Sequence, residues 1–161
     1  MTALRFLKGI GVFTLLVALH FLIRPLIATR VSIDFLVIAV LLASVHVRPG
    51  VAAIIGFLTG LIADSLTPLS LGAGALAMSA VASGASWLKA VVFGDNVVAQ
   101  GIFLGAGKLA FDIIYLVIEG RLAMSDLLVQ LLLWSPLSAL VTGLTGVLVV
   151  FTFRISMESR P

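Results

Sequence analysis

The chain contains no cysteine and few charged residues. Of its 161 residues, 11% are Asp, Glu, Lys or Arg, whereas 61% are hydrophobic. Without cysteine, the chain forms no disulfide and no thiolate metal site. Soluble domains are nearer a quarter charged and half apolar, and a chain this short cannot bury so many apolar side chains in one water-soluble core. The composition therefore predicts an all-α polytopic membrane protein without a separate soluble domain.

Sequence patterns for catalysis and for nucleic-acid binding are also missing. No H-E-x-x-H sequence and no phosphate-binding Gly-Lys-Ser/Thr loop occurs, and no serine has a partnered histidine in a hydrolase arrangement. His20 and His46 are not at metal-ligand spacing, and Asp34, Asp64 and Asp112 fall in separate apolar blocks. No basic patch is interleaved with aromatic residues. We therefore predict no enzyme activity, no metal or cofactor, and no nucleic-acid partner, although the sequence does not show whether the aspartates meet in space.

Six apolar blocks divide the chain, and turn-forming residues separate them. A helix needs about 20 residues to cross a bilayer. One transmembrane domain, a six-transmembrane-helix bundle, is therefore predicted over residues 1–161. Its expected spans are 8–28, 33–47, 50–66, 71–93, 97–118 and 127–153. The second span is short, and Pro136 predicts a kink in the sixth.

Basic residues predict the orientation of these spans. With six spans, both ends of the chain lie on the same side, and that side holds six basic residues, namely Arg5, Lys8, Arg48, Lys89, Arg154 and Arg160. The other side holds three, namely Arg24, Arg30 and Arg121. Because cytoplasmic loops carry an excess of Lys and Arg, we expect both termini in the cytoplasm.

The block at 50–66 carries Gly56, Gly60 and Asp64 at four-residue steps, and a turn with Pro68 and Gly72 follows. Steps of four place the two glycines and the acid on one helix face. Glycines let another helix approach the backbone closely, and a carboxylate in an apolar helix is expected to face protein rather than lipid. We predict that these five residues form a face for helix packing or for a partner.

A second stripe lies in the block at 97–118. Gly101, Gly105, Lys108 and Asp112 follow one face of a helix. Lys108 and Asp112 are four residues apart, so they can neutralise each other, which indicates a face directed into the bundle. A proton relay would also use buried ionisable groups and remains an alternative, although one neutralised pair is not a chain of proton carriers.

Arg24 and Asp34 complete the charges expected within the membrane region. Arg24 lies near the end of the first span and Asp34 begins the second, so both fall near the same surface as Asp64. Arg24 has either aspartate as a possible partner. In the alternative interpretation, these side chains extend to the lipid headgroups.

The chain resembles the rod shape-determining protein MreD family of the bacterial cell-wall elongation machinery. The similarity rests on Arg48-Pro49-Gly50, Gly56-Phe57, Gly60-Leu61, Asp64, Pro68 and Leu71-Gly72. The family tends to show a basic turn, a Gly-Phe-x-x-Gly-Leu helix ending in Asp, and a Pro-Leu-Gly turn, which Ser70 interrupts here. Asp34 matches an acidic or amide residue that opens the family's second span.

The resemblance implies a non-enzymatic component of the elongation complex (elongasome), located in the bacterial inner membrane among its lipids. Such a protein binds MreC directly, works beside MreB, RodA and a class B penicillin-binding protein, and helps to maintain rod shape. The alternative is the substrate-binding membrane subunit of an energy-coupling-factor vitamin transporter, also a small six-span protein. A polar ligand requires convergent polar groups. The chain has few of them, with one Asn (Asn96), two Gln (Gln100 and Gln130) and one Tyr (Tyr115), which argues against a polar vitamin but not against a lipid-like ligand.

Overall fold

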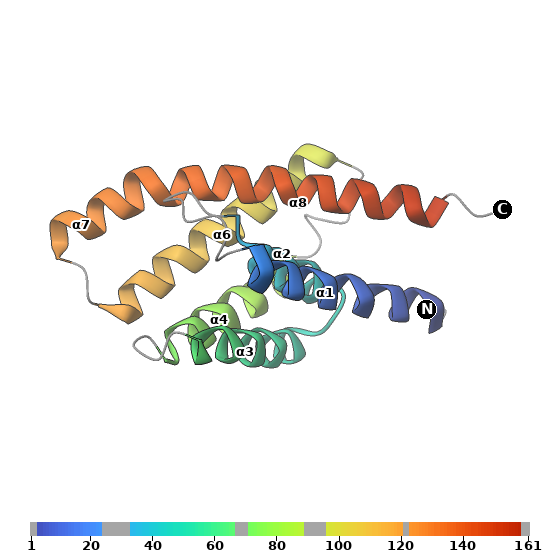
Figure 1. The fold of residues 1–161 in the computed structure, drawn as a ribbon, viewed down its shortest axis with the longest axis horizontal. Coiled ribbons are helices and arrows are strands. Elements are labelled where there is room, and N and C mark those ends of the chain that lie inside the picture. The colour runs from blue at the N-terminus through green and yellow to red at the C-terminus, as the bar shows by residue number, and fades with distance from the viewer. Residues whose placement is uncertain (1–2, 24–32, 67–70, 89–95, 121–122, 159–161) are drawn as a thin grey trace.

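The computed structural model describes residues 3–23, 33–66, 71–88, 96–120 and 123–158, and within these ranges the protein is helical with no strand (Figure 1). The helices are α1 (Ala3–Ile23), α2 (Phe35–Ser44), α3 (Pro49–Ser65), α4 (Ala73–Trp87), α6 (Val97–Glu119), α7 (Met124–Val129) and α8 (Ser135–Glu158). A π-helical turn, η2 (Gln130–Trp134), joins α7 to α8. The all-α prediction is confirmed for these residues. Arg24 and Pro68 lie outside them.

Local sequence signals explain where several helices begin and end. The Asp34 side chain caps the first turn of α2, and Asn96 caps α6 in the same way. Pro49 occupies the first turn of α3, where its missing N–H leaves no hydrogen bond unmade. Gly72, which precedes α4, has a φ of 98°, and Gly120, which ends α6, has a φ of 60°. Glycine adopts this left-handed backbone without the steric penalty of a side chain.

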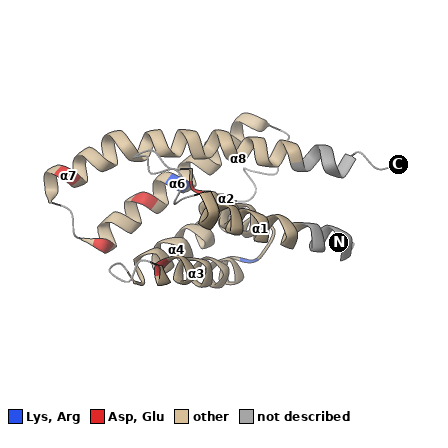
Figure 2. Ribbon diagram, viewed as in Figure 1, with Lys and Arg blue, Asp and Glu red and all other residues tan. Residues whose placement is uncertain are grey.

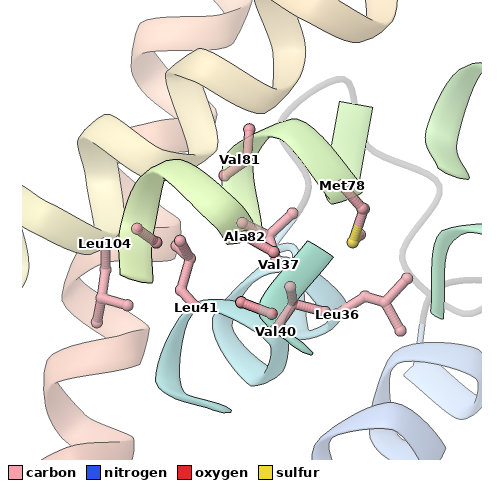
Figure 3. Close-up of a cluster of buried hydrophobic side chains, with 10 residues drawn as sticks. Leu36, Val37, Val40, Leu41, Met78, Val81, Ala82 and Leu104 are labelled. Carbon is pink, nitrogen blue, oxygen red and sulfur yellow. The ribbon is translucent and has the colours of Figure 1, made fainter. Parts of the chain in front are cut away.

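The apolar helix α2 forms the centre of the molecule. It contacts α1, α3, α4, α6 and α8, and every residue from Phe35 to Leu41 is buried. Figure 3 shows its side chains meeting Met78, Val81 and Ala82 of α4 and Leu104 of α6. Because α2 is enclosed by other helices, its sequence is apolar on all sides and lacks the period of an amphipathic helix.

The remaining helices pack mainly as two pairs around α2. α3 lies along α4, and α6 lies along α8. The start of α1 and the end of α8 lie at the same end of the molecule, whereas α7 lies at the opposite end (Figure 1).

The last helix differs from the predicted span in length and in regularity. It is continuous from Met124 through η2 into α8, whereas the sequence predicted a span over 127–153. Pro136 has no N–H to donate to the carbonyl of Leu132, so the α-helical hydrogen-bond pattern is interrupted there. The structure has a π-helical turn over Gln130–Trp134, two residues before Pro136.

Candidate functional site

A cavity of about 220 Å³ lies between α1, α2, α3, α4, α6 and the junction of η2 with α8. Five Asp, Lys or His side chains line it, namely His20, Asp34, Asp64, Lys108 and Asp112. The three aspartates that the sequence places on separate helices therefore converge on one cavity. Among the other side chains that the structure describes, the charged ones are Arg48, Glu119 and Asp126 (Figure 2).

Lys108 is the centre of the ionisable side chains in this cavity. Its Nζ lies 2.6 Å from Asp112 Oδ1 and 3.1 Å from Asp34 Oδ2. On the other side of Asp34, His20 Nδ1 lies 3.4 Å from Asp34 Oδ1. The structure thus contains the Lys108–Asp112 pair that the spacing predicts, but the pair is part of a larger group of four residues. We call His20, Asp34, Lys108 and Asp112 the ionic cluster.

Contacts from three helices hold the ionic cluster in place. The Asp34 N–H donates a hydrogen bond to Oγ1 of the buried Thr142 on α8, and Asp34 Oδ1 accepts one from the Val37 N–H on α2. The Ser135 hydroxyl is buried beside the Asp112 carboxylate. Lys108 Nζ also lies 5.1 Å from the centre of the Phe111 ring. The cluster therefore connects α1, α2, α6 and α8 through polar contacts.

Asp64 lies in the same cavity but has a different role. Its Oδ2 accepts hydrogen bonds from the backbone N–H groups of Gly72, at 2.9 Å, and Ala75, at 3.1 Å. These donors belong to the start of α4, where backbone N–H groups lack partners within the helix and the helix dipole favours a negative charge. A buried carboxylate at the end of α3 therefore caps the following helix.

The glycines of α3 complete this contact with α4. A Cβ atom at Gly60 would lie 2.6 Å from both the Ala75 Cα and the Gly74 carbonyl oxygen, and one at Gly56 would lie 2.5 Å from the Met78 carbonyl oxygen. The two backbones touch, so any side chain would force the helices apart. Gly56, Gly60 and Asp64 therefore face α4 of the same chain, and Gly72 lies at its start.

A similar close approach joins α6 to its neighbours. A Cβ at Gly105 would lie 3.3 Å from the Ala139 carbonyl oxygen of α8. A Cβ at Gly101 would lie 3.1 Å from a Val147 methyl group, also on α8. The stripe on α6 therefore has its glycines against α8 and its ionisable residues in the ionic cluster.

Several cavity residues were not predicted from the sequence to belong to a site. His20 joins the ionic cluster from α1, and Gln130 and Ser138 line the cavity from η2 and α8. A histidine within an apolar block was the available signal for His20. Tyr115 and Gln130 are two of the few polar residues that were counted against a polar pocket. Because they lie in one cavity, their scarcity is not an argument against ligand binding.

The ionic cluster offers carboxylate acceptors, an ammonium donor and a contiguous series of ionisable groups. A proton relay requires a series of neighbouring ionisable groups, which the Lys108–Asp112 pair alone does not provide and the ionic cluster does. Among the described residues, no group of three His, Cys, Asp or Glu residues is arranged to hold a metal ion. No protein-family model, no curated protein and no solved structure matches this chain.

Proposed function

We propose that this chain is a membrane protein whose six apolar segments all cross the bilayer. Two helices, Val97–Glu119 and Met124–Thr152, are long and apolar enough to do so. Only 11% and 28% of their most apolar parts are buried, whereas the core helix of a soluble protein would be mostly buried. Exposed side chains include Ile62 on α3, Ile102 on α6 and Leu148 on α8. Soluble monomers rarely expose large apolar patches, so exposed apolar side chains on three helices support a membrane environment.

The same proposal places both termini in the cytoplasm. An even number of spans requires both ends on one side, and the start of α1 and the end of α8 lie at one end of the molecule (Figure 1). The excess of basic residues on that side supports the cytoplasm. Reporter fusions at the two termini test this, and an extracytoplasmic signal from either end would contradict it.

Within this class, the proposed function is that of an MreD-like, non-enzymatic component of the bacterial elongation complex in the inner membrane. The proposed direct partner is MreC, with MreB, RodA and a class B penicillin-binding protein as further members. The observation that carries this proposal is the contact between α3 and α4. Gly56, Gly60, Asp64 and Gly72, which carry the resemblance, lie together at this contact.

The face of α3 toward α4 is occupied within the chain, so the partner contact is proposed for its outward face. Phe57 and Leu61, each next to one of the packed glycines, are exposed, and so are Ile54 and Leu58. Lipid chains are as apolar as these side chains, so the contact requires close packing against a partner helix rather than hydrophobicity alone. A single apolar span with small residues along one side has the chemistry to fit this face.

Co-expression with MreC and purification in mild detergent test the proposal. The double variant Phe57→Ala/Leu61→Ala is expected to reduce MreC recovery, and loss of the protein is expected to give rounded cells in a rod-shaped host. The matched control is Leu140→Ala/Leu144→Ala, which truncates two exposed leucines on α8 and should leave recovery unchanged. Failure of MreC to co-purify with the unmodified chain would contradict the proposal.

The cavity supports a second candidate function, the substrate-binding membrane subunit of an energy-coupling-factor vitamin transporter. Such a subunit needs a site with convergent polar groups, and Tyr115, Gln130 and Ser138 line this cavity together with the ionisable side chains. The same purification distinguishes the two candidates. Recovery of an ATPase module in place of MreC would favour the transporter subunit.

A further inference from the structure

The cavity has more negative than positive formal charge. The ionic cluster contains two carboxylates, Asp34 and Asp112, and one ammonium group, Lys108. With His20 neutral, its net charge is therefore −1. The remaining Asp, Lys or His side chain on the cavity wall, Asp64, adds a carboxylate whose oxygen is bonded to backbone N–H groups. A buried net charge is strongly unfavourable, so either a proton on one of these groups or an additional cation compensates it.

One wall of the cavity is aromatic. Phe111 and Tyr115 of α6 line it, and their rings are stacked with centroids 5.7 Å apart and planes inclined by 26°. In sequence they flank Asp112, one residue before it and three residues after it. Aromatic faces attract cations, and aromatic walls are a recurrent means of binding ammonium groups that carry carbon substituents. The negative charge and the rings thus favour the same kind of ligand.

The size and position of the cavity limit that ligand. A volume of about 220 Å³ equals roughly seven water molecules at ~30 Å³ each, which admits a small amine or a lipid headgroup. The π-helical turn η2 contributes Gln130 to the wall. π-Helical turns inside helices occur frequently at functional sites.

We propose that this cavity binds an alkylammonium group, held between the Asp112 carboxylate and the rings of Phe111 and Tyr115. Lys108 Nζ lies 2.6 Å from Asp112 Oδ1 and 5.1 Å from the centre of the Phe111 ring without a ligand, so in the bound state it gives up both contacts and pairs with Asp34 alone. The ammonium group belongs either to a free small amine or to the headgroup of a membrane lipid such as an ethanolamine lipid. The site is separate from the proposed MreC contact, which uses the outward face of α3, so either can fail without the other.

The probe for a free, small alkylammonium ion is choline, with its uncharged isostere 3,3-dimethylbutanol and sodium chloride as controls. Calorimetric titration of the full chain in detergent should give saturable binding of choline, and of neither control compound. The variants Asp112→Asn and Tyr115→Leu should each weaken binding about tenfold or more, the change that corresponds to one ordinary polar or cation–π contact. Glu119→Gln is the matched control, because it removes one negative charge from α6 outside the cavity wall and should leave binding unchanged.

Asp112→Asn separates binding from folding. It leaves the Lys108–Asp34 pair and makes the ionic cluster formally neutral, so its thermal unfolding midpoint should be no lower than that of the unmodified chain. Choline should also raise the thermal unfolding midpoint of the unmodified chain. An equal rise with sodium chloride or with the isostere would overturn the proposal. Unchanged binding in Asp112→Asn would do the same.

Lipid extraction from the purified protein, followed by mass spectrometry, identifies the source. Stoichiometric retention of an ethanolamine lipid by the unmodified chain, and its loss in Asp112→Asn, would assign the site to a lipid headgroup. Choline binding by lipid-free protein without such retention would assign it to a free amine. Absence of both would refute the site, and MreC recovery with Asp112→Asn would then still report separately on the proposed function.

Discussion

Helices α3 and α6 share a sequence pattern but use it differently. Each has two glycines four residues apart and an aspartate further along the same face. In α3 the glycines touch α4 and Asp64 caps that same helix through backbone N–H groups. In α6 the glycines approach α8, while Asp112 pairs with Lys108, which also reaches Asp34 on a third element. The pattern therefore identifies a packed face but does not determine what satisfies the acid.

The difference has an energetic consequence. Backbone N–H groups at the start of α4 are fixed dipoles, so Asp64 needs no other ionisable group to be present. Asp112 depends on a side chain that is shared with a second carboxylate. Loss of one partner leaves a buried charge uncompensated, which is far more damaging than the loss of a cap. The two sites should therefore respond differently to substitution.

The largest effect is expected for Lys108→Met. The change leaves Asp34 and Asp112 facing each other without a cation, and breaking a buried pair in this way costs about 3–5 kcal/mol in soluble proteins, less where lipid and water rearrange. The thermal unfolding midpoint in detergent measures it. The double variant Lys108→Met/Asp112→Leu should be less damaged than Lys108→Met, because it buries one unpaired carboxylate instead of two. It should be more damaged than Asp112→Leu, in which Asp34 still has Lys108 as a partner. A simple two-residue pair would instead make the double variant the mildest.

The next effect is expected for Gly60→Leu. Its side chain would enter the backbone of Gly74 and Ala75, so α3 and α4 must separate, and overpacking typically costs ~1–3 kcal/mol. The thermal unfolding midpoint of the purified protein and the recovery of MreC should both fall. Gly50→Ala is the control on the same helix, because a Cβ there meets nothing within 4 Å. If Gly60→Leu were as stable as Gly50→Ala, the close α3–α4 contact would be wrong.

A smaller effect is expected for Asp64→Leu. The change removes the acceptor for two N–H groups of the α4 region, and loss of a helix cap costs about 0.5–2 kcal/mol. Asp64→Asn keeps an acceptor oxygen and should lose less stability. Chemical denaturation in detergent compares the two variants. Equal losses in both would show that the charge, rather than the hydrogen bonds, determines the role of Asp64.

The smallest effect is expected for Asp112→Asn, which should leave the unfolding midpoint within error of the unmodified chain or raise it. The reason is that Lys108 keeps its ion pair with Asp34, at 3.1 Å, while the net charge of the ionic cluster changes from −1 to zero. A loss as large as that of Lys108→Met would show that Asp34 does not compensate Lys108.

The sequence was sufficient for the parts of this structure that depend on local spacing. The glycine faces and the Lys108–Asp112 pair follow from steps of three and four residues, whereas the helices follow from the apolar blocks and the turn residues between them. Asp34 and His20 could not be assigned to the ionic cluster, because Asp34 is 74 residues from Lys108 in the chain and no local pattern relates them. The cavity was missed for the same reason, since its polar residues are sparse along the chain and become neighbours only when the helices assemble.

The short length of α2 has a consequence for a bilayer. Ten residues rise about 15 Å, roughly half of a hydrocarbon layer about 30 Å thick. In the proposed orientation the α2–α3 turn at Arg48 and Pro49 lies at the cytoplasmic surface, so α2 reaches only about to the midplane and does not by itself complete the second crossing. Asp34 then lies deeper than the surface position that the sequence predicts. Polar groups at that depth require protein or water around them rather than lipid. The cavity beside Asp34 would then lie near the middle of the membrane, with α2 between it and the cytoplasmic surface.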